Sequence, residues 1–502
     1  MATCVTAAIL LIGGHPRAEL TPTIAPAPPD TEATTVTTHR ALVEQLDALL
    51  QQRFLKDAKI SIHVRDLATG ATVFEHDGST ALNPASNIKL VTTAAALSIL
   101  GPSHRYETAV KATKPVDGTV RGDLFLVGGG DPSLLTGDLY ELASRLRALG
   151  VREVTGGVVV DSSLFGADLS PPGYEQKQEF AAYRAPIGAT SVNFNTMELR
   201  VLPGDDSSPV RVSARPPVPS ITLHNDARTT QGSKRRIRIK PTTTADTSIG
   251  LKIEGSMGHR ARMALYRYPV PSPAHYAGEI FALTLSQVGI TLGSSSITLA
   301  TAPEGLESLA AHHSDPLGML IRAVNKLSSN FMAELIMHGL DRSVPVTPQG
   351  GLDLVRDWAS ELALLEGDSW IGNGSGLYDN NRISAEQLTR LLQHVHDDFR
   401  IYGDLLASLA IMGTDGTTRR RLRRTPHAGW IRAKTGTLDH ISALTGYAAV
   451  EGRAPVAFSI LFNDLPLGST AYARSTQDRI VEAVHGWLMA STHSLDGAAT
   501  SP

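Results

Sequence analysis

Residues 84–100 read PASNIKLVTTAAALSIL, and the tetrad Ser86-Asn87-Ile88-Lys89 inside them is the starting point for the fold. Serine is a good helix N-cap, and the apolar residues after it predict a helix that Gly101-Pro102 stops. Residues i and i+3 share one face of a helix, so the Ser86 hydroxyl and the Lys89 amine should lie side by side. A capping serine near a surface lysine would give the same pattern. Of the eleven lysines, however, only Lys89 has a serine three residues before it.

Two further motifs follow. Ser328-Ser329-Asn330 stands directly before the apolar run 331–337, and Lys434-Thr435-Gly436, followed by Thr437, ends a strand predicted from Trp430. A strand end with a cation, a hydroxyl and a glycine can bind a carboxylate while a peptide lies alongside as an added strand. Ser191-Val192-Asn193 has the spacing of the second motif, but no helical pattern follows it, so we favour 328–330.

Hydrophobic patterning predicts an α+β protein with a large insertion. Helical and strand-like runs at both ends of the chain indicate one domain, an antiparallel sheet flanked by helices, and short β-like runs broken by Gly, Pro and Asp separate its two parts. The predicted divisions are a signal remnant and Pro/Thr-rich linker over 1–37, a split catalytic domain over 38–104 and 273–490, an inserted, mainly β region of one or two modules over 105–272, and a flexible tail over 491–502.

Composition excludes several classes of function. A formal net charge of -3 gives no large field for nucleic acid, and the single cysteine, Cys4, excludes an intramolecular disulfide. The histidine pairs His312-His313 and His394-x-His396 lack metal-ligand spacing, so we expect no metal and no cofactor. Val5 to Ile12 resembles a weak signal-peptide core that is too short to span a bilayer, and no other segment is apolar enough for a stable membrane span.

The order Ser-x-x-Lys, Ser-x-Asn, Lys-Thr-Gly resembles the low-molecular-mass class C penicillin-binding proteins, the D-alanyl-D-alanine carboxypeptidase/endopeptidase family of the serine β-lactamase-like superfamily. An insertion follows the nucleophile helix in this family, which suits the long gap between the first two motifs. The likeness runs from about residue 40 to 488 and includes Gly128 to Pro132, Val160-Asp161 through Phe165, and Lys434 to Leu438. Asn373 and Tyr378 depart from the family pattern, where Asp and Ser are usual.

The resemblance implies a transpeptidase-like catalytic domain and a role for each motif. Ser86 would attack the carbonyl of the penultimate D-alanine, and Lys89 would be the base, its pKa lowered by burial and by Lys434. Ser328 would pass the proton to the leaving amine while Asn330 holds Lys89. The implied substrate-binding residues are Thr435, Gly436, Thr437, Leu438 and Asp161. Lys434 with the two threonine hydroxyls would receive the terminal carboxylate, the backbone N–H groups of Ser86 and Thr437 would bind the oxyanion, and Asp161 would reach the amine-bearing end of the stem peptide.

The expected function is a serine-type D-Ala-D-Ala carboxypeptidase, endopeptidase or both, acting on peptidoglycan stem peptides and inhibited by penicillin and other β-lactams. By family resemblance it would work in the periplasm or elsewhere outside the cytoplasm. A β-lactamase or esterase on the same fold, and a non-catalytic wall-binding protein, are the alternatives. The oligomeric state is left open.

Overall fold

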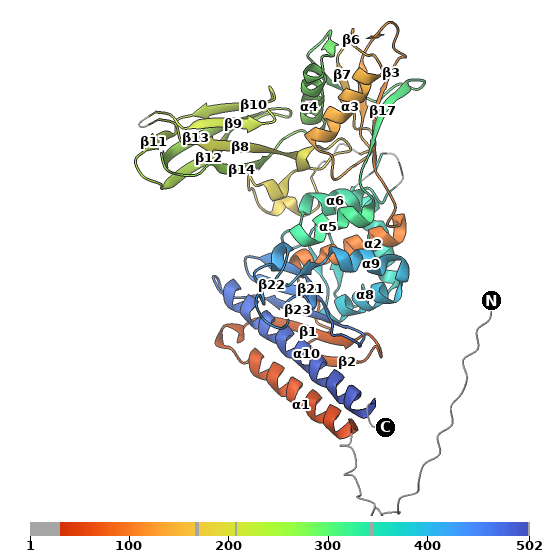
Figure 1. The fold of residues 1–502 in the computed structure, drawn as a ribbon, viewed down its shortest axis with the longest axis vertical. Helices are drawn as coiled ribbons and strands as arrows, with labels where there is room; N and C mark the ends of the chain where they lie inside the picture. Colours follow the sequence, from red (N-terminus) through yellow and green to blue (C-terminus); the bar gives the residue numbers. More distant parts are fainter. Residues whose placement is uncertain are drawn as a thin grey trace, which may run out of the picture.

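The computed structural model describes residues 31–499, apart from 166–169, 206–207, 342, 344 and 347. The predicted signal remnant and most of the predicted linker lie outside the described residues. The molecule is elongated, with a sheet and two long helices at one end, a helical layer in the middle and the insertion at the other end (Figure 1).

A six-stranded antiparallel sheet, in the order β2-β1-β23-β22-β21-β20, forms the base of the catalytic part. Its strands come from both ends of the chain: β1 (Lys59–Asp66), β2 (Thr72–His76), β20 (Ala410–Ile411), β21 (Ile431–Leu438), β22 (Ile441–Ala448) and β23 (Val456–Asn463). The strand-like runs predicted at both ends of the chain, including the strand predicted from Trp430, therefore lie in one sheet. The pair β1 and β23 joins segments about 400 residues apart, in a continuous register from Lys59–Asn463 to Asp66–Val456.

Alternation along these strands assigns the two faces of the sheet. Phe458, Ile460 and Phe462 of β23 pack in one core with α1 (Thr31–Leu50) and α10 (Thr470–Ala499), which lie side by side below the sheet (Figure 1). Ala457 and Leu461 face the other way, into the core of the helical layer. The sheet is thus buried on both faces.

The helical layer carries the first two motifs. Its members are α2 (Lys89–Leu100), α5 (Leu317–Leu327), α6 (Asn330–His338), α7 (Pro348–Glu361), α8 (Ala385–Asp397) and α9 (Phe399–Ser408). Residues 317–338 carry one continuous helical pattern of apolar residues. The structure divides it at Ser328, whose left-handed backbone, φ 60° and ψ 42°, ends α5.

The described part of the insertion contains four sheets and the helices α3 and α4; one of these sheets, β15-β6-β4, joins the short strands β4 (Thr119–Val120), β6 (Glu153–Val154) and β15 (Thr291–Leu292). A five-stranded sheet, β16-β7-β5-β3-β17, carries α3 and α4, and smaller sheets of order β14-β8-β9 and β10-β13-β11, with β12 on β13, project from it (Figure 1). The bounds are β3 (Glu107–Ala112), β5 (Leu124–Val127), α3 (Thr136–Ala148), β7 (Val158–Asp161), β8 (Thr196–Leu202), β9 (Arg211–Arg215), β10 (Ile221–Asn225), β11 (Arg228–Thr230), β12 (Arg235–Thr244), β13 (Ile249–Gly258), β14 (Ala264–Pro269), α4 (Pro273–Gln287), β16 (Ile297–Leu299) and β17 (Glu307–His313).

The structure differs from the predicted boundaries at three places. Residues 273–313 were assigned to the catalytic domain, yet α4 packs in the insertion core and β17 pairs with β3. The predicted linker ends at 37, whereas α1 begins at Thr31, and the predicted flexible tail from 491 continues α10 to Ala499. Periodicity identified α4 as a helix but could not show which core its apolar face joins.

No helix in the described part of the chain combines the length and apolar character that a bilayer crossing requires.

The insertion core yields a test of stability. Phe281 in α4 is fully buried in it, so Phe281→Ala should lower the unfolding free energy of the insertion by about 3–5 kcal/mol, measured by hydrogen exchange of its buried amides. Phe399→Ala is the matched control, because that ring is 94% exposed and should change stability by less than about 0.5 kcal/mol. Equal effects of the two substitutions would contradict this assignment of the core.

Candidate active site

Ser86 lies in a tight turn rather than at a helix cap. The 3-10 turn η2 (Ala85–Ile88) precedes α2, and its N-cap position is occupied by Pro84, so the predicted capping role of Ser86 is wrong. Two glycines leave room for this turn, because a side chain at either position would collide with it. A Cβ on Gly376 would meet the Ala85 carbonyl oxygen at 2.0 Å, and one on Gly436 would meet the Pro84 carbonyl oxygen at 2.6 Å. The Gly374–Gly376 loop and β21 therefore hold the Ser86 turn between them.

Lys89, at the first turn of α2, is fully buried beneath Ser86. Its Nζ lies 3.1 Å from Ser86 Oγ, donates to Asn330 Oδ1 at 2.8 Å and contacts the Ser375 carbonyl oxygen. These three contacts fix the amine next to the hydroxyl. Ser86 and Lys89 therefore lie side by side, as their spacing predicted, although Ser86 belongs to a 3-10 turn and Lys89 to the helix after it.

The second motif occupies the junction of α5 and α6. Ser328 ends α5, Ser329 caps α6 by accepting the Met332 N–H, and Asn330 is the first residue of α6. The left-handed Ser328 turns the chain so that Ser328 and Asn330 both reach the catalytic cluster. Apart from its bond to Lys89, Asn330 donates to the Tyr183 carbonyl at 3.2 Å.

Lys434 extends from β21 toward the second motif. Its Nζ is buried and donates to Ser328 Oγ at 2.8 Å and to the Thr435 carbonyl at 2.7 Å. The structure thus brings Ser86, Lys89, Ser328, Asn330 and Lys434 into one hydrogen-bonded cluster. Ser86, Thr435 and Thr437 line a shared cavity with Ser328, and Leu438 lines the neighbouring cavity that also contains Ser86.

Two lysines of the cluster, Lys89 and Lys434, are fully buried, and the buried carboxylate of Glu334 in α6 acts on Lys89. Burial lowers the pKa of Lys89 to about 7, and the Glu334 charge opposes that shift. Burial, with repulsion from Lys89, also holds the pKa of Lys434 well below its usual value. The predicted cause of the Lys89 shift, burial, is the main one, whereas the repulsion between the lysines acts on Lys434. Glu334 accepts the Ser375 and Gly374 N–H groups and so also fixes the loop over Lys89.

A cavity of about 700 Å³ opens beside Ser86 and Asn330. Its walls include Glu179 and Tyr183, which sequence reasoning missed, and Tyr378. Tyr378 donates to Glu179 at 3.2 Å, and Tyr183 contacts the same carboxylate, which lowers the pKa of Glu179 and raises that of Tyr183 to about 12. No motif marks Glu179 and Tyr183, because these two residues lie on a loop of the insertion. In the sequence, Tyr378 departs from the family pattern, where a Ser is usual, and this departure pointed to the wall.

Asp161 is not brought to the cluster. It ends β7 and lines another cavity, together with Glu107 and Lys111. Its carboxylate accepts the Ser163 N–H at 2.9 Å and the Ala302 N–H at 2.8 Å, so it holds a turn and a strand end together. The structure thus gives this residue local contacts away from Ser86.

The described residues contain no group of three or more His, Cys, Asp or Glu side chains that could hold a metal ion.

This fold and this cluster define an active-site serine enzyme of the penicillin-binding class. Among known protein families, the D-Ala-D-Ala carboxypeptidase 3 (S13) family matches residues 42–486. The chain belongs to that family, as the three motifs predicted, and it is a peptidase.

Individual proteins agree with the family assignment. The D-alanyl-D-alanine carboxypeptidase of Actinomadura sp. (strain R39) is 32% identical over 442 residues, 84% of this chain and 81% of that protein. D-alanyl-D-alanine carboxypeptidase DacB of Haemophilus influenzae is 23% identical over 430 residues, which cover 84% of this chain and 88% of that protein. The crystal structure of penicillin binding protein 4 (dacB) from H. influenzae matches with a TM-score of 0.75 at 22% identity, covering 88% of this chain and 99% of that one. A structure of it with a β-lactam covers 87% and 97%, with a TM-score of 0.70 and 22% identity. The predicted fold class is confirmed.

The burial of Lys89 has a consequence for pH dependence. Only the neutral amine can take the Ser86 proton, so the rate constant for acylation by labelled penicillin should rise with pH around an apparent pKa of about 7 and fall about tenfold per unit below it. Labelling between about pH 5 and 9 measures this profile. As a control for unfolding, protein held at each pH is returned to neutral pH and labelled again. A flat profile, or a midpoint near the ordinary lysine value, would contradict the role of burial.

Proposed function

We propose that this protein is a serine-type D-Ala-D-Ala peptidase that works through an acyl-enzyme on Ser86. The observation that carries the proposal is the buried Lys89 amine 3.1 Å from Ser86 Oγ, with its pKa lowered to about 7. A serine hydroxyl becomes a useful nucleophile when a neighbouring base can accept its proton near neutral pH.

The reaction follows from the positions of the catalytic groups. Lys89 takes the Ser86 proton as Oγ bonds to the carbonyl carbon of the penultimate D-alanine. The negative charge on the carbonyl oxygen is accepted by the backbone N–H groups of Ser86 and Thr437. As the C–N bond breaks, the proton taken by Lys89 passes through Ser328, which is bonded to Lys434, to the leaving amine, so that Lys89 is neutral again. Water then attacks the ester, its proton passes to Lys89, and Ser86 Oγ leaves with a proton.

The carboxylate end of the substrate would meet a cationic edge. Thr435 and Thr437 lie on the exposed side of β21, and Arg474 of α10 donates to Thr437 Oγ1 at 3.2 Å. The cavity shared by Ser86 and these threonines is also lined by Arg419, Arg420 and Arg421 of one loop. Together with Lys434 and the two hydroxyls, Arg474 would bind a free terminal carboxylate, which favours carboxypeptidase over endopeptidase action.

The other end of the substrate would enter the cavity beside Asn330. Leu438 supplies apolar contact there, and Glu179, one of several carboxylates that line this space with Asp379, Asp439 and Asp464, would take the role first expected of Asp161. A side-chain amine of a stem peptide would pair with Glu179 at the cost of its Tyr378 or Tyr183 contact.

Peptidoglycan stem peptides are the substrates that this chemistry implies, and β-lactams are the expected inhibitors. The H. influenzae protein of the same fold has been solved with a β-lactam bound. An enzyme acting on D-Ala-D-Ala ends of wall peptides would work outside the cytoplasm.

Replacement of Ser86 tests the proposal directly. Wild type should keep labelled penicillin as a stable adduct on Ser86, located by mass spectrometry, and should release D-alanine from bisacetyl-Lys-D-Ala-D-Ala. Ser86→Ala should lose the adduct and at least about 99% of the release, because the residual rate of such enzymes without their nucleophile is small. Ser295→Ala, at an exposed serine of the insertion, is the control and should behave as wild type. Rapid turnover of penicillin would indicate a β-lactamase instead, and equal slow release by wild type and Ser86→Ala would indicate a non-catalytic protein.

Arg474 should act on substrate binding rather than on chemistry. Loss of a hydrogen bond to a carboxylate costs about 1.5–3 kcal/mol, so Arg474→Gln should raise KM for the D-Ala-D-Ala peptide roughly tenfold or more with a small change in kcat. The same peptide with a C-terminal amide should be hydrolysed equally by both proteins. Arg479→Gln, at an exposed arginine of α10 outside this cavity, is the control. An equal loss on both peptides would contradict carboxylate recognition by Arg474.

A further inference from the structure

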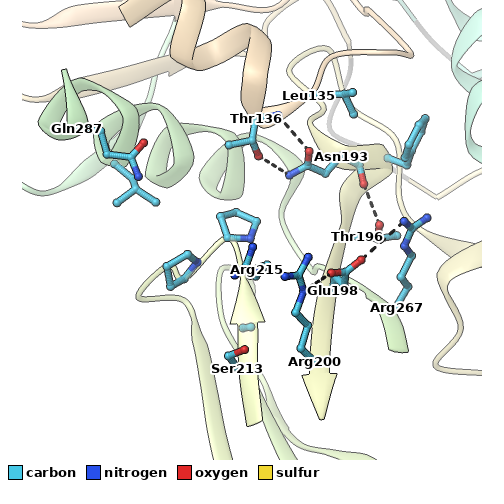
Figure 2. A pocket seen from close by; sticks show the side chains of 15 residues that line it. Leu135, Thr136, Asn193, Thr196, Glu198, Arg200, Ser213, Arg215, Arg267 and Gln287 are labelled. Carbon is cyan, nitrogen blue, oxygen red and sulfur yellow. Dashed lines mark hydrogen bonds and ion pairs between the residues drawn. The ribbon is translucent and has the colours of Figure 1, made fainter. Parts of the chain in front are cut away.

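A cavity of about 650 Å³ lies within the insertion, and its lining does not overlap that of the cavities at Ser86. Strands β8, β9 and β14 form one side, and the start of α3 and the end of α4 form the other (Figure 2). The site described above uses none of these residues, and no family motif falls on them.

Strand register gathers three arginines on the cavity side of the small sheet. Arg215 of β9 and Arg267 of β14 are both cross-strand partners of Glu198 in β8. Arg200 is two residues along β8 from Glu198, so its side chain projects from the same face. The intervening Leu199 is fully buried on the other face. The arrangement therefore follows from the fold of the sheet and not from one flexible loop.

Two of the three guanidinium groups lie near one carboxylate, that of Glu198, and the third does not. Arg200 lies 2.8 Å and Arg267 3.9 Å from the Glu198 carboxylate, whose side chain is 21% exposed (Figure 2). Within the part of the chain that the structure describes, Arg215 has no ion-pair partner. The cavity thus holds an excess of positive charge, and Glu198 shows that a carboxylate fits between guanidinium groups there.

The rest of the wall is a mixture of apolar groups and side-chain hydroxyls and amides. Phe194, Pro216, Pro217 and Leu283 give apolar contact. Thr136, which pairs with Asn193 at 2.8 Å, and Gln287 give polar contact from α3 and α4 (Figure 2). Such a lining suits a short peptide, which has amides and aliphatic carbons beside its carboxylate. A phosphodiester polymer carries repeated charges and little apolar surface, and it fits this partly apolar lining less well.

We propose that this cavity is a second binding site, for the carboxylate of a short acidic peptide, with Arg215 as its principal charge partner. A planar guanidinium donates two parallel hydrogen bonds to a carboxylate, which makes arginine the suitable residue. The chemistry of the site is independent of Ser86, and only the identification of the peptide as an uncross-linked wall stem rests on the proposed function. The enzyme would then hold one stem peptide in the insertion while another is processed.

The cavity also adjoins α6, the helix that begins at Asn330. Phe194, which lines it, makes an edge-on contact with Phe331 at 6.0 Å between ring centroids. Phe331 directly follows Asn330, which holds Lys89. A peptide in the cavity therefore contacts a side chain that packs against the second motif.

Binding can be measured without turnover. The probe is N-terminally fluorescein-labelled L-Ala-γ-D-Glu-L-Lys, which has two free carboxylates and no D-alanine to release, and the readout is fluorescence anisotropy on intact protein with and without penicillin. We expect saturable binding in both states. Arg215→Glu should raise Kd at least about tenfold, as expected for loss and reversal of a bidentate charge contact. Arg238→Glu, at an exposed arginine on β12 of another sheet, should leave Kd within about twofold of wild type.

Several outcomes would overturn the proposal. These are absence of saturable binding to wild type, equal Kd for Arg215→Glu and Arg238→Glu, equal binding of the probe with both carboxyls amidated, or displacement by inorganic phosphate more readily than by unlabelled peptide. Arg215→Gln is a second variant that introduces no repulsion, and penicillin labelling of Ser86 reports whether each variant is folded. If wild type fails to label, the proposed function is in doubt, but Arg215-dependent binding still decides this proposal.

Discussion

The site depends on the burial of an amine. Lys89 lies fully inside the protein, among Ser86, Asn330 and the Ser375 carbonyl, and the buried carboxylate of Glu334 acts on it. Loss of water at Lys89 and Lys434 favours their neutral forms, and Glu334 opposes that effect at Lys89. The helices and strands around the cluster exclude water from Lys89, and that exclusion lowers its pKa to about 7, as the proposed role of a base requires.

Close backbone contacts are what bring the three motifs together. β21 and the Gly374–Gly376 loop reach the Ser86 turn because Gly436 and Gly376 have no side chains. The left-handed turn at Ser328 adds the third side of the cluster. Each motif comes from a different part of the chain, so the site forms only in the tertiary fold and not within any one local segment.

The sequence predicted the parts of the site that local patterns determine. Spacing placed Ser86 beside Lys89, and alternation identified strands of the six-stranded sheet. It could not place Glu179, Tyr183 or Arg474, because no motif surrounds them and only tertiary packing brings them to Ser86. The same limit explains the error at 273–313: the apolar face of α4 is visible in the pattern, but its partner, the insertion core, is not. Asp161 was assigned to the site by the family resemblance, and its backbone partners account for that carboxylate locally.

The pairing of β1 with β23 has a consequence for the biosynthesis of the protein. The strand that leads to the Ser86 turn is among the first parts of the folded chain to be made, yet its neighbour in the sheet is among the last. Formation of contacts over such a separation is slow, because a long loop must close first. A nascent chain that has not reached Asn463 lacks the strand between β1 and β22, and β21 with its Lys-Thr-Gly motif cannot be held against the serine. The order of synthesis would therefore leave the proposed site around Ser86 incomplete until nearly the whole chain is present.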